Sequence, residues 1–277
     1  MKRLVKFCLF FLVLFFTLTS CEISKTIDLE LPPYNSKYVL LGFIGDSTIH
    51  NIYFGKTIPP YSESSDTIPN TDIKLFADNQ LIVTLERIDA NTYGTNPDYL
   101  VDSNSNAFFK FEANLINGEK VYNKPIQRPK KVAIDSVQIL RSQNNMERTI
   151  KIYFTDPLEK NYYATRIEIQ KDNEYIPINN DSYEIFSPAD IFDDVSFNGK
   201  HTAISKVVEV SFNSKNNFRI KLFSITEETF QFYLSLRLNR LGYRDFYNPT
   251  FEVISNIENG TGCIGAYRSS TVYKEEK

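Results

Sequence analysis

Three aspartates stand close together in the sequence, at Asp190, Asp193 and Asp194. Neighbouring carboxylates can bind calcium, or two of them can serve as the acid and base pair of a glycosidase. A solvated acidic loop is the third interpretation. We favour it because no nearby residue in the sequence holds these side chains in place. Residues 182–201, which contain the aspartates, are expected to form an irregular loop with a turn at Asn198-Gly199.

The other residues that can do chemistry are scattered. His50 and His201 are far from each other and from Cys263, whereas a zinc site needs several ligands at short spacing. A Ser-His-Asp triad can assemble from distant positions, but no Gly-x-Ser-x-Gly element supports one, and no glycine-rich phosphate loop is present. We therefore predict no catalytic, cofactor-binding or metal-binding residue. We expect Cys263 to be a small buried apolar residue.

One further segment has the opening spacing of a calcium loop, with Asp102, Asn104 and Asn106 at alternate positions. It departs from that pattern immediately afterwards. Ala107 stands where the loop needs glycine, and Ala113 stands where the bidentate glutamate belongs. The segment is therefore predicted to be a polar loop that precedes a strand.

The strongest chemical signal is at the N-terminus, where Leu18-Thr19-Ser20-Cys21 resembles a bacterial lipobox. A basic start and an uninterrupted apolar stretch at residues 7–16 precede it, and that stretch is too short to span a bilayer permanently. We predict that residues 1–20 are a signal peptide and that Cys21 is acylated and anchors the protein to a membrane. Residues 21–36 are expected to be a tether. The alternative is an ordinary cleaved signal that happens to end at a cysteine.

Composition excludes some classes of protein. Removal of residues 1–20 leaves 257 of the 277 residues and takes away Lys2, Arg3 and Lys6, which changes the formal net charge from −3 to −6. No basic patch remains, so nucleic acid is not expected as a partner. With Cys8 removed and Cys21 acylated, Cys263 has no intramolecular disulfide partner, so stability must come from packing of the 22 Phe, 17 Tyr and aliphatic side chains.

Short stretches with alternating or continuous apolar residues predict a mainly β (α+β) protein. In the first half, a buried strand is expected at residues 38–44 and a short one at 51–56. Hairpins are expected around Asp78-Asn79 and Asn117-Gly118, because these residue types tolerate the positive φ of tight turns. The spacing of these strands favours an immunoglobulin-like or transthyretin-like β-sandwich at residues 37–128.

The proline-containing, cationic segment 124–131 is the predicted domain boundary. A second, antiparallel β domain is expected at residues 132–277, with strands at 134–140, 149–154, 162–170, 207–212, 218–223 and 266–273. One helix is predicted at about residues 226–241, with Ser224 and Glu227 at capping-box spacing. Its expected buried face comprises Phe230, Tyr233, Leu234, Leu238 and Leu241, while Phe232 and Leu236 on the other side indicate that both faces are covered.

Several motifs along the whole chain resemble a lipoprotein family of Bacteroidota, domain of unknown function 4249 (DUF4249). They are Cys21 with Ile27-Asp-Leu, Tyr38-Val-Leu-Leu-Gly-Phe-Ile44, Gly118-Glu-Lys-Val-Tyr122, Ile134-Asp-Ser-Val137, Phe154-Thr-Asp-Pro157, Asn161-Tyr-Tyr163, Phe197-Asn-Gly-Lys200, the helix from Ser224 to Leu238, and the closing Ser255-Asn-Ile-Glu-Asn-Gly-Thr-Gly-Cys-Ile-Gly265. Cys263-Ile264 stand where the family often has an aliphatic residue and Phe. We expect the three glycines of the closing motif to have a structural role before the last strand.

The resemblance implies an accessory outer-membrane lipoprotein, cell-surface facing or on the periplasmic face, that partners a TonB-dependent transporter in the uptake of a nutrient or ligand. It defines no catalytic residues and no cofactor, so we expect no enzymatic activity. Contacts are expected through the loops at residues 58–70 and 182–201. The alternatives are a structural or adhesive surface protein, and a hydrolase that uses Asp190, Asp193 or Asp194.

Overall fold

The computed structural model describes residues 34–46, 48–49, 51–59, 68, 71–95, 101–102, 105–142, 146–178, 185, 187–210, 216–242 and 252–276. Residues Ser36–Lys277 form one compact unit, distinct from Met1–Asn35. The predicted signal peptide, Cys21 and nearly all of the tether lie outside the described residues.

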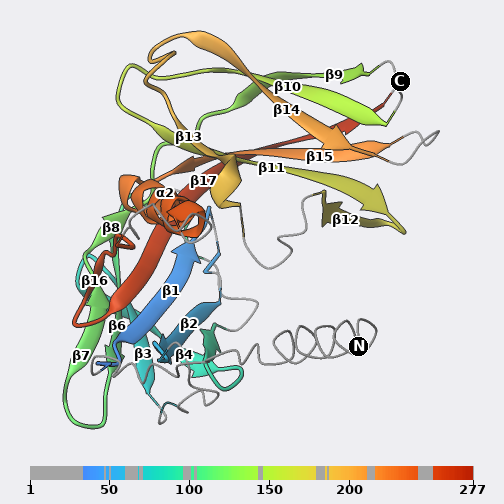
Figure 1. The fold of residues 1–277 in the computed structure, drawn as a ribbon. Helices are drawn as coiled ribbons and strands as arrows, with labels where there is room; N and C mark the ends of the chain where they lie inside the picture. The colour runs from blue at the N-terminus through green and yellow to red at the C-terminus, as the bar shows by residue number, and fades with distance from the viewer. Residues whose placement is uncertain are drawn as a thin grey trace, which may run out of the picture. The chain divides into compact units, whose positions relative to one another are not determined.

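The described residues are mainly β, as predicted, and contain one α-helix, α2 (Glu227–Gly242), and one short 3-10 helix, η1 (Pro188–Asp190) (Figure 1). The strands of the first half are β1 (Tyr38–Ile44), β2 (Ile52–Lys56), β3 (Asp72–Ala77), β4 (Gln80–Arg87), β5 (Thr92–Gly94), β6 (Phe108–Asn114), β7 (Lys120–Asn123) and β8 (Ile126–Gln127). Those of the second half are β9 (Ile134–Arg141), β10 (Glu147–Thr155), β11 (Tyr162–Lys171), β12 (Glu174–Pro177), β13 (Ile191–Asp193), β14 (His201–Glu209), β15 (Asn217–Ile225), β16 (Ile257–Glu258) and β17 (Thr261–Glu275).

Most of these strands are connected in one hydrogen-bonded path, in the order β12-β11-β15-β17-β1-β2-β5-β4-β3-β6-β7-β16. Strand β13 joins it beside β11, and β8 joins it beside β6. A separate three-stranded sheet has the order β14-β10-β9, and Figure 1 shows it stacked over β11, β15 and β17.

Strand β17 connects the strands of the two halves. Its first part runs parallel to β1, with Val39 opposite Thr261 and Ile44 opposite Ala266. Its second part runs antiparallel to β15, from Tyr267 to Glu275. The parallel pair was not expected from the sequence, because the partners are more than 200 residues apart in the chain. The division into domains at residues 37–128 and 132–277 stays a prediction.

The segment predicted as a domain boundary, residues 124–131, contains strand β8 and a buried arginine. Arg128 donates to the carbonyl oxygens of Gly45, Asp46, Asp102 and Ser105. Its guanidinium also lies over the ring of Phe109. A charged side chain is rarely buried unless its donors find acceptors, and here four carbonyls accept from the two terminal nitrogens of the guanidinium.

The three largest of the four apolar cores in the described residues lie between these layers. The first joins residues of β1 and β2 to residues of β3 and β6, including Leu40, Phe54, Leu75 and Phe111. The second lies between the three-stranded sheet and β15, where Ile150 and Ile152 meet Phe218 and Ile220. A third lies between α2 and the opposite face of the main sheet, and its members include Tyr162, Phe223, Phe230, Cys263 and Tyr267.

The structure confirms the two hairpin turns predicted at Asp78-Asn79 and Asn117-Gly118. Asp78 and Asn79 both have positive φ, at 48° and 65°, and they connect the paired strands β3 and β4. Gly118 has φ 84° in the turn between β6 and β7. These residue types accept the left-handed region at low steric cost, which is why the local sequence was sufficient.

Several predicted bounds were wrong. Strand β14 begins at His201 rather than at residue 207, and β17 begins at Thr261 rather than at residue 266. Ser224 does not cap the helix, because it lies within β15 and its hydroxyl accepts a hydrogen bond from the backbone N–H of Val132. The first helical bond instead runs from the N–H of Phe230 to the carbonyl of Thr226, which makes Thr226 the residue that precedes α2.

Candidate functional site

An apolar pocket of about 480 Å³ opens between helix α2 and strands β1, β2 and β17. This volume lies in the range of pockets that hold small organic molecules. Most of the wall is apolar or aromatic, while Asn51 adds an amide and Tyr53 and Tyr233 add hydroxyl groups. The lining residues are Leu41, Gly42, Phe43, Asn51, Tyr53, Ile185, Phe232, Tyr233, Leu236 and Cys263.

Strand β1 separates this pocket from the first core. Successive side chains of a strand point to opposite faces. Leu40 and Ile44 therefore pack in the first core, while Leu41 and Phe43 face α2 and line the pocket. These contacts on both faces explain the uninterrupted apolar run of residues 38–44. A strand with one solvent-exposed face would alternate apolar and polar residues.

Helix α2 forms the opposite wall. Phe230 stacks on Tyr162 of β11 with ring centroids 4.7 Å apart, as expected for the buried face. Phe232 is as buried as Phe230, and Phe232 and Leu236 both line the pocket. Leu234, by contrast, is only partly buried. The pocket wall on α2 is therefore built by Tyr233 of the predicted stripe together with Phe232 and Leu236 outside it, and the position of these last two was the available sequence signal for it.

Among the residues that the structure describes, the pocket lining contains no carboxylate, amine, guanidinium or imidazole. Its thiol, Cys263, is 1% exposed, and burial raises the pKa of this group well above its ordinary value. The thiol hydrogen points to the carbonyl of Glu228, with sulfur and oxygen 3.9 Å apart. A protonated, buried thiol is a poor nucleophile, so the chemistry of this lining is suited to binding rather than to proton or acyl transfer. Cys263 behaves as the predicted small buried apolar residue.

The closing glycine motif, residues 255–265, contains Cys263 of the pocket lining and the start of β17. Gly262 has φ 116°, and a Cβ there would lie 2.3 Å from the carbonyl oxygen of Leu40. A Cβ on Gly265 would lie 2.5 Å from the Thr229 hydroxyl and 2.7 Å from the ring of Phe43. These glycines let β17 approach β1 and α2 closely, which is the structural role predicted for them.

The side chain of Asn256, in the same motif, forms the two hydrogen bonds with the backbone of Ile264 that a neighbouring strand would otherwise form. Its side-chain amide donates to the carbonyl of Ile264 at 2.8 Å and accepts from the N–H of Ile264 at 3.1 Å. Asn259, with φ 59°, donates to the carbonyl of Lys120 in β7. The motif therefore stabilises the start of β17, next to the cysteine that lines the pocket.

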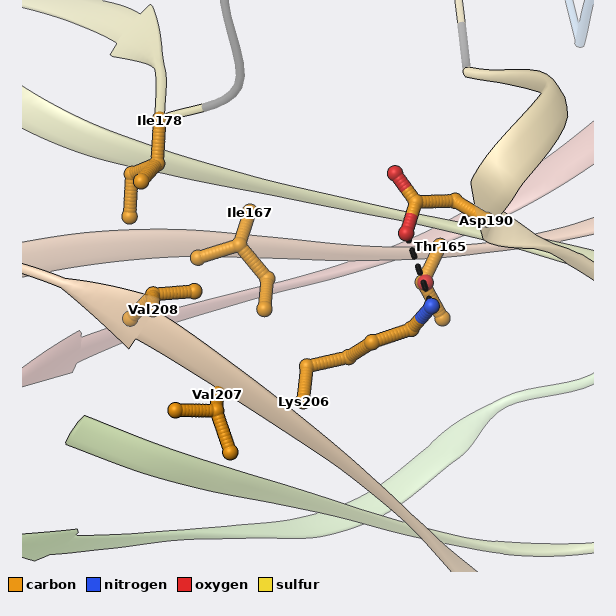
Figure 2. Close-up of a pocket in the computed structure, with 7 residues that line it drawn as sticks. All are labelled: Thr165, Ile167, Ile178, Asp190, Lys206, Val207 and Val208. Atoms are coloured by element: carbon orange, nitrogen blue, oxygen red, sulfur yellow. Dashed lines mark hydrogen bonds and ion pairs between the residues drawn. The ribbon is translucent and has the colours of Figure 1, made fainter. Parts of the chain in front are cut away.

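The three aspartates considered for calcium or glycosidase chemistry are held by different partners. Asp190 in η1 forms an ion pair with Lys206 of β14, with Nζ and Oδ1 2.7 Å apart. Figure 2 shows this pair at one end of a small pocket of about 70 Å³, with Thr165 beside it and Ile167, Ile178 and Val208 towards the other end. That volume is too small for a sugar ring and its neighbours. The pair connects the three-stranded sheet to the main sheet.

Asp194 is buried and accepts a hydrogen bond from the backbone N–H of Asn161 at 2.6 Å. Asp193 accepts from the backbone N–H of Val195, which is the geometry of a local turn. Among the residues that the structure describes, no group of three or more His, Cys, Asp or Glu side chains is placed to hold a metal ion. The geometry therefore offers no support for a calcium site built from Asp190, Asp193 and Asp194. Part of the loop at 182–201 is also regular, because η1 and β13 lie within it.

Residues of three motifs meet at Asp156, which are Phe154-Thr-Asp-Pro157, Asn161-Tyr-Tyr163 and Phe197-Asn-Gly-Lys200. Its carboxylate accepts from the hydroxyl of Tyr163 and from the N–H of Gly199, 2.9 Å away. The ring of Tyr163 packs against Phe154 and Phe197, with centroids 5.2 and 6.4 Å apart. Burial and the neighbouring carboxylate raise the pKa of the Tyr163 hydroxyl, so it remains a proton donor. These motif residues are therefore explained by packing of the loop that precedes β14.

The remaining sequence candidates are separated in the fold. His201 is largely exposed at the start of β14, with Nδ1 3.3 Å from Asp135. His50 and Asn104 lie outside the described residues. Asp102, from the segment with calcium-loop spacing, presents its carbonyl oxygen to the guanidinium of Arg128.

Two buried charged clusters were missed by sequence reasoning. Glu168 of β11 is surrounded by Arg166, Arg219 and Lys221, and Glu276 is bound by Arg141 and Arg148. Side chains alternate between the two faces of a strand, and this places the members of the first cluster on one face of β11 and β15. The pairing of these two strands, which brings the members together, cannot be predicted from the local sequence.

Residues 24–272 match the sequence model of the family described as Domain of unknown function (DUF4249). The chain belongs to this family. The match covers both halves of the chain and includes the motifs around Asp156 and the closing glycine motif. A search of curated proteins found no match to this DUF4249 member. In the part of the chain that the structure describes, no helix has the length and apolar character to cross a membrane.

Proposed function

We propose that this DUF4249 protein is a non-catalytic accessory lipoprotein of the outer membrane that binds a ligand, or a segment of a TonB-dependent transporter, during uptake. The observation that supports it is the pocket beside α2. This pocket has the volume of a small-molecule site, and its described lining is mostly apolar, without acid, base or exposed nucleophile. An uncharged lining favours an uncharged, largely apolar occupant, because a charged group there would lose its hydration without a partner.

A dye experiment tests the pocket. The neutral dye Nile red is expected to bind the purified full-length protein with a stoichiometry of about one. Leu236→Trp fills the pocket and should abolish this binding, while Leu158→Trp, at an exposed position, should not change it. Equal dye binding by both variants and the wild type would show that the pocket is not the binding site.

Attachment to the membrane through Cys21 is part of the proposal, and it rests on the Leu18-Thr19-Ser20-Cys21 motif. Metabolic labelling with a fatty-acid probe should mark the wild type but not Cys21→Ser. Equal labelling of both would remove the anchor from the proposal. Protease treatment of intact cells then distinguishes a cell-surface location from the periplasmic face, since only a surface protein is accessible to it.

The transporter partner rests on the family resemblance and is tested by purification from native outer membranes. A tagged wild-type protein should recover a TonB-dependent barrel in stoichiometric amount, identified by mass spectrometry. The strands of the first half, whose core lies between β1 and β2 on one side and β3 and β6 on the other, fit the proposed immunoglobulin-like or transthyretin-like sandwich. Such sandwiches present binding loops at their ends.

A structural or adhesive role is the second candidate. It is favoured by the exposed apolar side chains Leu81 and Ile82 in β4 and Ile88 just after it, with 54%, 42% and 58% of their surface accessible. Exposed apolar groups on a strand favour association with another strand or copy. Sedimentation of the wild type and of Leu81→Lys decides this: a concentration-dependent oligomer that is lost in Leu81→Lys would support adhesion.

A further inference from the structure

A cluster of four charged side chains lies on the face of β11 and β15 that is opposite to the three-stranded sheet. Its centre is Glu168, whose side chain is only 3% exposed. Arg166 Nε lies 2.9 Å from one carboxylate oxygen, Lys221 Nζ lies 3.5 Å from the other, and Arg219 Nε contacts that second oxygen as well. Strand pairing fixes this arrangement, because Glu168 is directly opposite Arg219 and Arg166 is directly opposite Lys221.

Lys221 and Arg219 share one oxygen of a single carboxylate, that of Glu168. Arg166 contacts the other oxygen and also donates to the backbone carbonyl of Ile185. Burial lowers the pKa of Lys221, and Arg219 and Arg166 lower it further, while Glu168 acts in the opposite direction. One carboxylate therefore does not fully compensate the lysine. Neighbouring like charges at this depth are costly unless another anion is present.

The cations remain accessible to a ligand in solution. The side chains of Arg166, Arg219 and Lys221 are 19%, 26% and 25% exposed, so each is partly buried but still reached by solvent. Tyr175 holds the Arg219 guanidinium from one side, with the cation 4.8 Å from the ring centroid, and Tyr175 in turn packs edge-on against Tyr273. A guanidinium held in this way has less freedom to lose when it binds an oxyanion.

We propose that Lys221 and Arg219 bind the oxyanion group of a small ligand in solution, of the carboxylate, sulfate or phosphate class, beside Glu168. Guanidinium and ammonium groups are the usual protein donors to such anions, and hydrogen bonds between ions are stronger than neutral ones. Glu168 holds the cations in place and also competes with the ligand for them. This site is separate from the apolar pocket, and its proposal does not depend on the function proposed above.

Calorimetric titration of the full-length protein with inorganic sulfate tests this site, at an ionic strength kept constant with chloride. Lys221→Gln removes one donor and should weaken sulfate binding at least about tenfold. Glu168→Gln removes the internal competitor and should tighten it by about tenfold. The control is Glu112→Gln, because Glu112 is also shared by two cations, Lys110 and Lys120, but in the other half of the chain. This control should leave sulfate affinity unchanged.

The two substitutions in the cluster act in opposite directions on sulfate affinity, which a purely structural ion-pair cluster would not produce. If Glu168→Gln does not fold, Lys221→Gln against the wild type still decides the matter. Unchanged affinity in Lys221→Gln, or no measurable heat from the wild type up to ~10 mM sulfate, a range that covers weak charge-assisted binding, would overturn the proposal. Titration with phosphate and acetate then ranks the oxyanion classes.

Discussion

At the scale of single residues, the least expected feature is a buried ion cluster at the end of the chain. Glu276, only one residue before the C-terminal Lys277, contacts Arg148 of β10 and Arg141 of β9, and its second oxygen accepts from Asn216 at 2.9 Å. Arg148 and Glu276 are almost fully buried, with 2% and 3% of their side-chain surface exposed. This cluster attaches the end of β17 to the three-stranded sheet.

Loss of the Glu276 charge should destabilise the protein strongly. In Glu276→Gln the shape is kept, but the buried guanidinium of Arg148 loses its negative partner. Breaking a buried pair in this way costs about 3–5 kcal/mol, because the remaining charge is left poorly compensated. Chemical denaturation should show this loss, and Glu275→Gln, at the exposed neighbouring position, should stay close to the wild type. A similar stability for both variants would contradict the structural role.

The same carboxyl gives a pH dependence with a definite sign. Burial alone would raise the pKa of Glu276, but the hydrogen bonds from Asn216, Arg148 and Arg141 outweigh it and the pKa is lowered. Its contribution to stability is therefore complete above the ordinary glutamate pKa and is lost as pH falls through the lowered value in the folded state. The difference in unfolding free energy between the wild type and Glu276→Gln should shrink on acidification below about pH 4. A difference that is constant from pH 7 to pH 3 would argue against this assignment.

At the scale of elements, β1 and α2 share the apolar pocket and the core beside it. Phe230 carries much of their packing, because its ring stacks on Tyr162 and is buried in the same cluster as Phe223 and Tyr267. Leu234 is only partly buried in that cluster. The helix therefore depends most on Phe230 and its neighbours rather than evenly on the whole predicted stripe.

Phe230→Ala should lower the unfolding free energy by about 3–5 kcal/mol, through lost burial and the cavity left behind. Leu234→Asp should also destabilise, but by less than a charge at a fully buried position, since the carboxylate can reach solvent. Arg240→Ala on the exposed side of the last turn is the matched control and should change stability by less than about 0.5 kcal/mol. Thermal unfolding measures all three, and an unaffected Phe230→Ala would mean that α2 does not pack on β11.

At the scale of the whole molecule, β17 pairs with strands of both halves of the compact unit Ser36–Lys277, so we expect the two halves to unfold together. The strand pairs with β1 through residues 261–266 and with β15 through residues 267–275. If either half unfolds together with β17, the other half loses the strand that pairs with β1 or with β15. Cooperativity between the two halves is therefore expected from the backbone hydrogen bonds of one strand.

Differential scanning calorimetry should show one transition, with equal calorimetric and van't Hoff enthalpies. Gly262→Ala would force a Cβ to 2.3 Å from the Leu40 carbonyl oxygen, so it should lower the temperature of that single transition without splitting it. Two separate transitions in the wild type would instead favour independently folding domains at residues 37–128 and 132–277.

The sequence by itself determined the class of the fold and most of its local structure. Alternation and turn residues were sufficient for β1, for the hairpins at Asp78-Asn79 and Gly118, and for helix α2, because these depend on neighbours along the chain. The motifs that resemble DUF4249 were likewise sufficient for the family, which the match over residues 24–272 shows. Bounds were less accurate at β14 and β17, where pairing with distant strands sets the ends.

Only the tertiary structure decided which side chains meet. The parallel pairing of β1 with β17 creates the pocket wall from Leu41 and Cys263, and pairing of β11 with β15 places Lys221 beside Glu168. Such contacts depend on register between segments far apart in the chain, and local periodicity carries no information about that register. For the same reason the sequence could not distinguish a solvated acidic loop from the Lys206 pair that holds Asp190.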